Sequence, residues 1–319
     1  MANPSSFSSQ EFEKLPKETC WESFDLYKFH GFWYPGILLS GVLGVQSHFE
    51  ARSDDVILAS FPKTGTTWLK ALCSCILQEH DHDHDHDDQL SLKNPHALVR
   101  GLEYDLFKDD VTLSDIDLST MPSPRLFHTH MPYSHLPDSV LKNPDCKIVY
   151  ITRNPKDVFI FNWHFFNSDS WRTSPEPYPM EKVLDEFCKG HQFCGPFFDH
   201  VLEFWFESLK MPEKILFLKY EEMKRDPKGE LKKLAAFLGR PFSNEEQVEK
   251  VLWRSSFDRL KNLEVNKNGV VFDLELSNKL FFRRGIVGDW KNYFTDEMKK
   301  KLDEISCMKL EGSGLDFEM

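Results

Sequence analysis

Residues Asp55–Leu72 read DVILASFPKTGTTWLKAL, and this stretch holds the first indication of how the chain folds. The apolar run 55–60 is typical of a short buried strand, and a helical pattern over Thr67–Glu79 follows a tight turn. Ligands of open α/β sheets bind beyond the carboxyl ends of the strands, so this turn lies at the binding edge. The helix N-terminus there offers unpaired N–H groups and the positive end of the helix dipole, which together favour an anion.

The turn itself contains residue types that suit a phosphate-like group. Lys63 supplies a full positive charge, and Gly65 lets the backbone approach an anion closely. Thr66 and Thr67 add hydroxyl donors, and Trp68 follows them directly. A Walker A loop is excluded, because that motif reads GxxxxGK followed by Ser or Thr and places its lysine after the last glycine. A plain structural connection is the alternative, but the density of these residue types favours an anion site.

The rest of the chain alternates short apolar runs with helical patterns. We predict further strands over 125–129, 147–152 and 215–220, and helices over 154–166, 181–209, 229–238, 245–253 and 295–306, with a break at Gly195-Pro196. Residues 21–49 are rich in aromatic side chains and are expected to be helical or irregular. This alternation predicts an α/β fold of one domain, with a central, mostly parallel sheet and helices on both faces. We assign residues 16–319 to that domain, 1–15 to a flexible tail and 80–90 to a flexible His/Asp loop.

Composition and charge exclude several classes of partner. The formal net charge of −12 argues against a general binder of nucleic acids or anionic membranes, whose footprint would be basic. The longest apolar stretch, around Gly36–Val45, is shorter than the roughly 20 residues of a membrane span, and the N-terminus lacks the pattern of a signal peptide. Seven cysteines without paired CxxC motifs indicate reduced thiols, so we expect a cytoplasmic protein without a zinc site.

The segment FPKTGTTWLKAL resembles the 5′-phosphosulfate loop of the plant-type cytosolic (soluble) sulfotransferases, which use 3′-phosphoadenosine 5′-phosphosulfate (PAPS) as the sulfuryl donor. Four further segments agree with that family in order and spacing. They are THMPYSHLP (Thr129–Pro137), YITRNPKDVF (Tyr150–Phe159), LKYEEMKRDP (Leu218–Pro227) and FFRRGIVGDWKNYFT (Phe281–Thr295). The resemblance runs from about Leu26 to Gly314. It implies an enzyme that transfers the sulfuryl group from PAPS to a hydroxyl of a small acceptor.

The resemblance also implies a role for each matched residue. Lys63 stabilises the charge that develops on the leaving 5′-phosphate, and His130 is the catalytic base that removes the proton of the acceptor hydroxyl. The residues implied to bind PAPS are Lys63, Thr64, Gly65, Thr66, Thr67, Trp68, Arg153, Tyr220, Ser255, Phe257, Arg283, Arg284 and Gly285. Among them, Trp68 and Phe257 match the adenine sandwich, and the arginines match the clamp on the 3′-phosphate. The family needs no metal, and we expect none.

One position departs from the family pattern. Eight residues after the first arginine of the clamp, the family usually places a serine that binds the 3′-phosphate, and this chain has Phe161. The loss of one neutral donor to a phosphate costs about 1.5–3 kcal/mol, so we predict weaker PAPS binding than in relatives. His128 precedes the catalytic base by two residues. Its role stays open, because family members often carry Lys, Ser or Asn there.

Two weaker signals concern metals and oligomers. The tract HDHDHDHDD over 80–88 contains groups that bind transition metals, but a flexible polar tract lacks the fixed geometry of a real site. We therefore interpret it as a solvated loop. Lys291–Thr295 fits the spacing of the dimerisation segment of animal family members, but Asp296 replaces its apolar residue, which favours a monomer.

Aromatic residues make up 14% of the chain, which favours a planar phenolic acceptor such as a flavonoid. Desulfoglucosinolates, brassinosteroids and hydroxylated acids are the alternative acceptors. Two further hypotheses are a nucleotide kinase with an aberrant phosphate loop and a catalytically weak or inactive PAPS-binding relative, as a consequence of Phe161. We expect the acceptor pocket to be lined by Phe29–Tyr34, Trp163–Phe166 and Phe197–Phe206.

Overall fold

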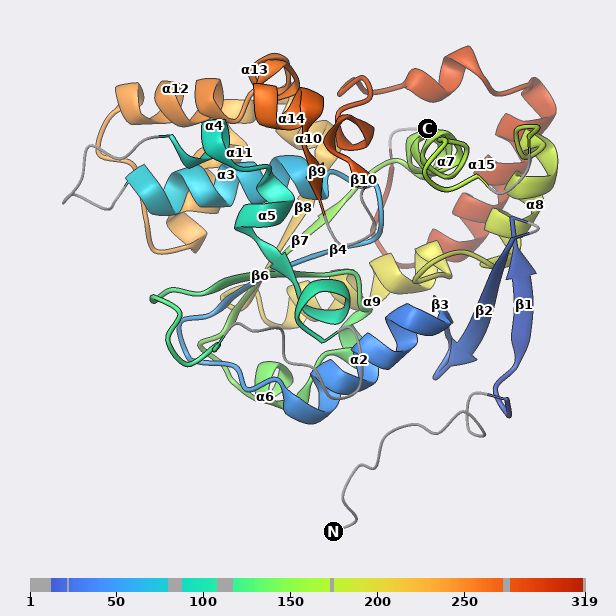
Figure 1. Cartoon of the computed structure of the whole chain (residues 1–319), viewed down its shortest axis with the longest axis horizontal. Helices are drawn as coiled ribbons and strands as arrows, with labels where there is room; N and C mark the ends of the chain where they lie inside the picture. Colours follow the sequence, from blue (N-terminus) through green and yellow to red (C-terminus); the bar gives the residue numbers. More distant parts are fainter. Residues whose placement is uncertain are drawn as a thin grey trace, which may run out of the picture.

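A five-stranded parallel sheet lies at the centre of the chain (Figure 1). The computed structural model describes residues 13–21, 23–79, 88–107, 117–172, 175–271 and 276–317. Across the sheet the strands follow in the order β5 (Arg100–Gly101), β6 (Leu126–Thr129), β4 (Val56–Ser60), β7 (Lys147–Thr152) and β8 (Ile215–Lys219). Each neighbouring pair is parallel, so all five carboxyl ends lie at one edge.

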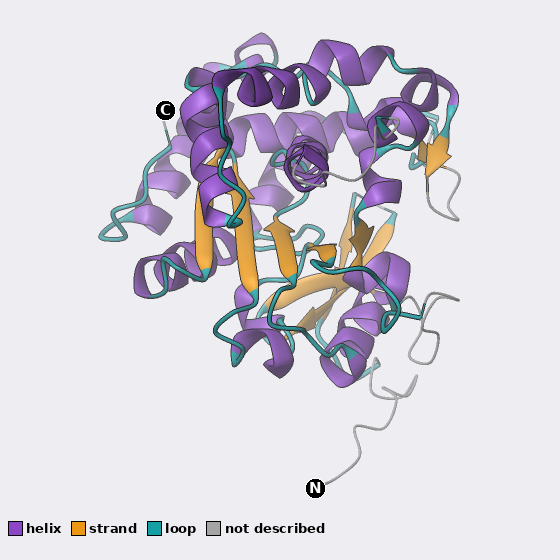
Figure 2. Ribbon diagram, turned by 90° about the vertical axis from the view of Figure 1, so that its left-hand side faces the viewer, coloured by secondary structure: helices purple, strands orange, loops and turns teal. Residues whose placement is uncertain are grey.

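Helices cover both faces of this sheet, as Figure 2 shows. Successive residues of β4 enter two different cores, with Ile57 and Ala59 in the first and Val56 and Leu58 in the second. The first core receives α2 (Gly36–His48), α7 (Pro155–Phe166), α8 (Met180–Lys189), α9 (Phe197–Lys210) and α15 (Asp296–Leu310). The second receives α3 (Thr66–Glu79), α10 (Tyr220–Arg225), α11 (Pro227–Phe237), α12 (Glu245–Arg254) and α13 (Phe257–Asn262). This double burial explains why the strands read as continuous apolar runs.

Shorter elements connect the main ones. An antiparallel sheet contains β1 (Lys17–Cys20), β2 (Phe24–Phe29) and β3 (Phe32–Pro35), and a small ladder pairs β9 (Val270–Val271) with β10 (Leu276–Ser277). The short helices are α4 (Gln89–Leu92), α5 (Pro95–Leu98), α6 (Asp138–Leu141), α14 (Glu264–Asn268), the π-helix η1 (Leu102–Leu106), and the 3-10 helices η2 (Tyr133–His135), η3 (Asn278–Phe281) and η4 (Asp289–Asn292). Among the described helices, none has the length and apolar character needed to cross a membrane.

The predicted α/β fold, with a parallel sheet between two helical layers, is confirmed. The four predicted strands correspond to β4, β6, β7 and β8 and differ from them by at most one residue at an end. The predicted helix over 181–209 is divided into α8 and α9. Gly190 ends α8 with a φ of 85°, which favours glycine, and Pro196 precedes α9. The predicted loop 80–90 ends earlier, because α4 begins at Gln89; residues 1–12 and 80–87 lie outside the described residues.

The expectation that residues 21–49 are helical or irregular is wrong for their first part, where β2 and β3 form a hairpin. His30 and Gly31, in the turn, have φ values of 43° and 97°, the left-handed region that a tight hairpin turn requires. Strand β3 is hard to recognise from its sequence, because its residues Phe32, Trp33 and Tyr34 are all buried. No alternation of polar and apolar residues therefore marks β3.

Gly41→Ala is expected to lower the free energy of unfolding by about 1–3 kcal/mol. Gly41 lies in the middle of α2, and a Cβ there would lie 1.8 Å from the backbone oxygen of Glu103, so the π-helix η1 would have to move. Urea unfolding measures the change. Gly36→Ala is the matched control on the same helix, since its Cβ would meet only the Tyr27 ring, at 3.5 Å. Equal stability of the two variants would contradict the close packing of α2 on η1.

Candidate active site

The loop between β4 and α3 contains two residues with a left-handed backbone, Lys63 at a φ of 70° and Gly65 at a φ of 121°. A Cβ on Gly65 would lie 2.9 Å from the Tyr220 ring and 3.0 Å from the Ile151 side chain, so only glycine fits there. The Thr64 hydroxyl donates to the carbonyl oxygen of Ile151 at 2.9 Å. These contacts fix the loop against the carboxyl ends of β7 and β8.

A cavity of about 800 Å³ opens at this edge of the sheet. The predicted site residues that line it are Lys63, Gly65, Thr66, Thr67, Trp68, His130, Arg153, Tyr220, Ser255, Phe257, Arg283, Arg284 and Gly285. Thr64 is the exception among the predicted set, because its side chain is buried in the interior. The cavity therefore brings together groups that come directly after four neighbouring strands.

The Lys63 ammonium lies among three phenylalanine rings. Its Nζ is 3.0 Å from the ring centroid of Phe165, and the centroids of Phe281 and Phe161 are 5.1 and 5.5 Å away. Ring faces attract a cation, but they replace its hydration only in part. No described carboxylate forms an ion pair with Lys63, and burial lowers the pKa of Lys63 well below its ordinary value.

His130 follows β6 and lines the cavity. Its Nδ1 lies 2.7 Å from the backbone carbonyl oxygen of Ser60. A carbonyl oxygen only accepts, so Nδ1 carries the proton and Nε2 has the lone pair. Burial lowers the pKa of His130 to about 3, so the ring is neutral at physiological pH. The predicted base thus has the tautomer and the charge needed to accept a proton at Nε2.

Glu103, which is not among the predicted site residues, holds the backbone around the predicted base. Its Oε1 accepts from the backbone N–H of His130 at 2.6 Å, and its Oε2 accepts from the Thr129 hydroxyl at 2.9 Å. Burial raises the pKa of Glu103 to about 7, although these hydrogen bonds act in the opposite direction. The available signal was the run LEYDLF (102–107), in which acidic residues lie between apolar ones.

Two arginines each keep one N–H group without a partner beside the cavity. Arg153 forms an ion pair with Asp157 at 3.1 Å, and Arg283 and Arg284 both pair with Asp289. The Nε atoms of Arg153 and Arg283 are buried and have no hydrogen-bond partner in the described part of the chain. Buried donors without partners are costly. These two atoms therefore fit an anionic group such as the 3′-phosphate, as the resemblance implies.

The residues implied to hold adenine line the same cavity. Trp68, at the start of α3, meets Tyr220 edge-to-face, with ring centroids 5.5 Å apart. Gly285 has a φ of 66°, and a Cβ there would lie 2.6 Å from the Phe257 ring, so glycine makes room for that ring. The Ser255 hydroxyl donates to a backbone carbonyl at 2.8 Å, which leaves its oxygen as an acceptor for an amine.

Phe161 lies between two cationic side chains of the site. Its ring centroid is 5.5 Å from Nζ of Lys63 and 5.6 Å from the guanidinium carbon of Arg283. Its neighbour Asn162 also lines the cavity, where its amide donates to the carbonyl oxygen of Val158 at 3.2 Å. Phe161 thus replaces a hydroxyl donor with a ring that both cations contact.

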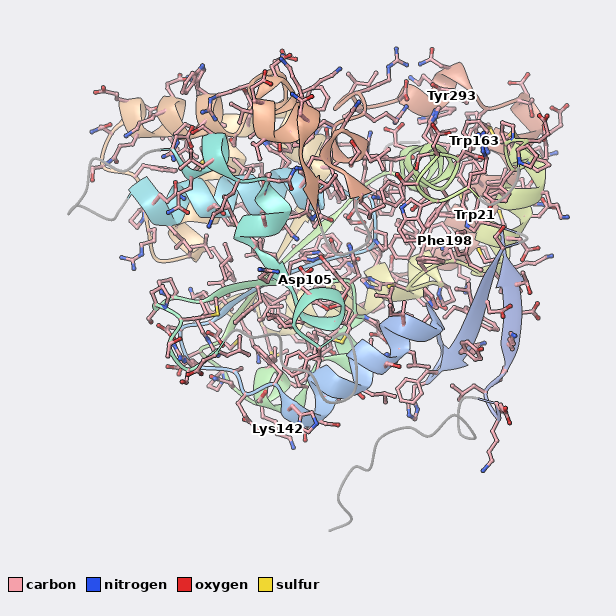
Figure 3. The ribbon with its side chains drawn as sticks, viewed as in Figure 1. Trp21, Asp105, Lys142, Trp163, Phe198 and Tyr293 are labelled. Atoms are coloured by element: carbon pink, nitrogen blue, oxygen red, sulfur yellow. The ribbon has the colours of Figure 1, made fainter. Side chains whose placement is uncertain are left out.

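The remaining wall of the cavity is apolar and largely aromatic. It contains Phe24, Pro35, Ile37, Leu38, Phe165, Phe166, Trp171, Phe193 and Leu276. Figure 3 shows how densely side chains fill the region around α7, where Trp163 is labelled. A wall of this kind suits a flat apolar molecule that brings one polar group to His130.

Two of the three segments predicted to line the acceptor pocket do not contribute to it. No residue of Phe29–Tyr34 or Phe197–Phe206, all of which are described, lines the cavity. On α9, Phe204 stacks on Tyr150 of β7 with ring centroids 4.2 Å apart, so the aromatic face of this helix packs on the sheet. The third segment, 163–166, does contribute through its last two residues.

The His/Asp tract lies outside the described residues except for its last position. Asp88 caps α4 and accepts hydrogen bonds from Arg254 at 2.9 Å and from Arg259. Within the described ranges, no group of three His, Cys, Asp or Glu side chains is placed to hold a metal ion. Asp88 is thus part of a structural ion-pair cluster, not of a flexible loop.

Comparison with known proteins shows which family shares this site. Residues 53–314 match the family model of the sulfotransferase domain. The chain belongs to the sulfotransferase family. It is 45% identical to cytosolic sulfotransferase 7 of Arabidopsis thaliana over 309 residues, which cover 95% of this chain and 93% of that protein. It is 42% identical to flavonol 3-sulfotransferase of Flaveria bidentis, with coverage of 94% and 97%.

A solved structure agrees with this assignment. The crystal structure of mouse sulfotransferase SULT7A1 complexed with PAP, the desulfated product of PAPS, superposes with a TM-score of 0.72 at 32% identity. The match covers 90% of this chain and 95% of that one. The predicted resemblance to plant cytosolic sulfotransferases is confirmed, and the enzyme class is that of a PAPS-dependent sulfotransferase. The hypothesis of a nucleotide kinase is not supported.

The amine of Lys63 is expected to react with acetic anhydride at lower pH than an ordinary lysine, whose pKa is about 10.4. A lowered pKa means that the reactive neutral amine appears earlier as the pH rises. Mass spectrometry of the Lys63 peptide after trace acetylation between about pH 6 and pH 11 gives the midpoint. Phe165→Ala admits water to the ammonium and should move this midpoint upward. A midpoint near the ordinary value in the unmodified chain would contradict the apolar seat of Lys63.

Proposed function

We propose that the chain is a cytosolic enzyme that transfers the sulfuryl group of PAPS to the hydroxyl of a small phenolic acceptor, most favourably a flavonoid. The observation that carries this proposal is the convergence of Lys63, His130 and Arg153 on one cavity beyond the carboxyl ends of the strands. The acceptor oxygen attacks sulfur in line as the bond to the 5′-phosphate oxygen breaks. The hydroxyl proton moves to His130, and PAP leaves with the electron pair of the broken bond.

In this proposal, the donor lies along the line from the phosphate loop to the arginines. The N–H groups at the start of α3 and the hydroxyls of Thr66 and Thr67 hold the 5′-phosphate. The buried Nε groups of Arg153 and Arg283 bind the 3′-phosphate. Lys63 leaves its seat among the rings and stabilises the bridging oxygen as charge develops there, which is the transition-state role of a preorganised cation.

His130 acts as the base through the nitrogen that the backbone leaves available. The carbonyl of Ser60 keeps the ring proton on Nδ1 and also accepts from the imidazolium as it forms. Glu103 holds the backbone N–H of His130, so the ring keeps its position during transfer. Because burial lowers the pKa of His130 to about 3, the ring stays unprotonated throughout the physiological range until it takes the acceptor proton.

The acceptor class follows from the wall opposite the donor. Phe24, Phe166, Trp171 and Phe193 offer ring surfaces that suit a planar aromatic acceptor. The cationic side chains that line the cavity are Lys63, Arg153, Lys224, Arg283 and Arg284. All but Lys224 are assigned to the donor, which leaves little to bind a hydroxylated acid. The similarity to a flavonol 3-sulfotransferase also supports a flavonoid acceptor.

Cytosolic localisation is part of this proposal and is supported by relatives that are named cytosolic sulfotransferases. The predicted use of PAPS without a metal ion is supported by the unpartnered arginine N–H groups, which offer cationic donors to the phosphate. The absence of nucleic-acid and membrane partners and the monomeric state, which Asp296 favours, stay predictions.

His130→Ala is expected to reduce sulfate transfer to a flavonol by about 10²- to 10⁴-fold, because general-base catalysis contributes that much. Transfer of labelled sulfate from PAPS in the presence of EDTA measures the activity, and calorimetry with PAP measures donor binding. Donor affinity should stay within about threefold, since the base does not hold the nucleotide. Phe161→Ser and the unmodified chain serve as active controls. Undiminished transfer by the alanine variant would exclude His130 as the base.

Phe161→Ser is expected to tighten PAP binding by about 10- to 100-fold, because a hydroxyl donor to the 3′-phosphate replaces the ring. Calorimetric titration with PAP gives the dissociation constant, and the KM for PAPS should fall in parallel. Phe161→Ala separates the two effects of the change, since it removes the ring without adding a donor. Equal affinities of the serine and alanine variants would show that position 161 does not reach the phosphate.

A further inference from the structure

Behind the phosphate loop lies a buried lysine that the proposed mechanism does not use. Lys70 is on α3, one turn after the two loop threonines, and none of its surface is exposed. Its Nζ lies 3.0 Å from the carbonyl oxygen of Val99, 3.1 Å from Nδ1 of His96 and 3.4 Å from the hydroxyl of Tyr104. An ammonium has three N–H donors and no acceptor. This set of three neighbours therefore matches the charged form of Lys70.

The first hydrogen-bond chain runs from Lys70 through His96 to Thr67. Burial and the charge of Lys70 lower the pKa of His96 well below its usual range, so its ring is neutral. Because Nδ1 accepts from the ammonium, the ring proton sits on Nε2. This nitrogen lies 2.9 Å from Oγ1 of Thr67 and donates to it. The hydroxyl proton of Thr67 then points away from His96, and Thr67 lines the cavity.

The second chain is longer and ends at the neighbouring threonine. The Tyr104 hydroxyl accepts from Lys70 and donates its own proton to Nδ1 of His128 at 2.6 Å. His128 then carries its ring proton on Nε2, which lies 3.2 Å from Oγ of Ser60. The Ser60 hydroxyl donates in turn to Oγ1 of Thr66 at 2.7 Å. The proton of Thr66 is thereby left for a ligand of the cavity.

We infer that Lys70 is a positioning residue whose ammonium fixes the direction of both hydrogen-bond chains, so that Thr66 and Thr67 present hydroxyl protons to the anion of the donor. The inference rests on the proposed function, because that anion is the 5′-phosphate end of PAPS. It also gives His128, whose role the sequence left open, a place in the second chain.

The neutral form of Lys70 cannot maintain the direction of both hydrogen-bond chains. An amine has two N–H donors and one lone pair, and the carbonyl of Val99 accepts only. The lone pair of a neutral Lys70 therefore faces one of the three acceptors. His96 or Tyr104 relieves this repulsion by donating to Lys70, which reverses the chain behind it. The threonine at the end of the reversed chain turns a lone pair toward the cavity, and a lone pair repels an anion.

The surroundings of Lys70 place the change from its charged to its neutral form near neutral pH. Burial lowers the pKa of Lys70 to about 7, while the carboxyl groups of Asp105 and Glu103 act in the opposite direction. Both belong to η1, and Asp105 is labelled near the middle of Figure 3. The other titratable groups near Lys70 are His96 of α5, Tyr104 of η1, His128 of β6 and His130 directly after β6. Burial keeps all four of them in the neutral form, which the two chains require of His96, Tyr104 and His128.

The sign of the pH dependence follows from linkage. An anion binds more tightly to the charged form of Lys70, so binding raises its pKa. PAP affinity is therefore highest below about pH 7 and falls as the pH rises toward the pKa of the complex, by at most about tenfold per pH unit. Lys63 and Glu103 titrate beside the same cavity, so their contributions have to be separated by variants.

A double-mutant cycle between Lys70 and Thr67 tests the inference, with the Kd of PAP at pH 6.5 as the readout. Thr67→Val should weaken binding about tenfold in the unmodified chain and less than about twofold in the Lys70→Met background. Lys70→Met alone should weaken binding about tenfold. Lys214→Met is the matched control. Lys214 is another buried lysine with three hydrogen-bond acceptors, which in its case are all backbone carbonyls, and it is remote from the loop. It should leave the Kd and the effect of Thr67→Val unchanged.

The pH dependence is tested by the number of protons that the protein takes up when PAP binds, which calorimetry in two buffers at pH 8 measures. Uptake on PAP binding should persist in Lys63→Met and in Glu103→Gln, and it should fall when Lys70→Met is added to either. Tyr104→Phe keeps the lysine and breaks only the second chain, so it should abolish the effect of Thr66→Val and spare that of Thr67→Val. This variant tests the inference even if Lys70→Met does not fold.

The outcomes separate the two proposals. Normal PAP binding with additive effects of Lys70→Met and Thr67→Val would overturn the role of Lys70 and leave the proposed function intact. Failure of the unmodified chain to bind PAP at millimolar concentration would overturn both, because no donor anion would then be held by the loop.

Discussion

The site depends on one constraint, which is the burial of both faces of the parallel sheet. Ile57 and Ala59 enter one core, and Val56 and Leu58 enter the other, so β4 has no exposed face for polar groups. The carboxyl edge is the part of the sheet where backbone groups and polar side chains meet a cavity. Parallel pairing in register then places the loop after β4 beside His130 of β6. The groups proposed to be catalytic are neighbours because of the strand order, although they lie far apart in the sequence.

This burial also determines the electrostatics of the site. The chain carries a net charge of −12, yet the cavity is lined by several cations, of which Arg153 is buried. Burial lowers the pKa of Lys63 and of Lys70, because each is charged in a region of low polarity. An anion with two phosphate-like ends would relieve both this cost and that of the unpartnered arginine N–H groups. Binding of such an anion therefore stabilises the charged groups of the site.

Much of this arrangement could be predicted from the sequence, and the misses have physical reasons. The strands after which Lys63, His130 and Arg153 follow are buried on both faces, so continuous apolar runs mark them clearly. Glu103 and Tyr104 were missed because a π-helix has no periodicity that a sequence window detects. Lys70 reads as the polar position of an ordinary helix, and its partners come from segments about 30 residues away. Long-range hydrogen-bond partners of this kind leave no local signal.

The phenylalanine at position 161 is consistent with the rest of the site because its ring lies beside the Lys63 ammonium, although it offers no hydrogen-bond donor to the phosphate. A serine there would donate to the phosphate, whereas the Phe161 ring completes a seat for the Lys63 ammonium together with Phe165 and Phe281. In the proposed mechanism, this seat stabilises the state in which Lys63 is away from the donor. A ligand shifts the equilibrium between the two positions of Lys63 only as far as it binds one of these states more tightly than the other. Aromatic contact gives about 0.5–2 kcal/mol, whereas the charge on the bridging oxygen grows during transfer. In the proposed mechanism, Lys63 therefore leaves the rings most readily in the transition state, where its charge lowers the barrier.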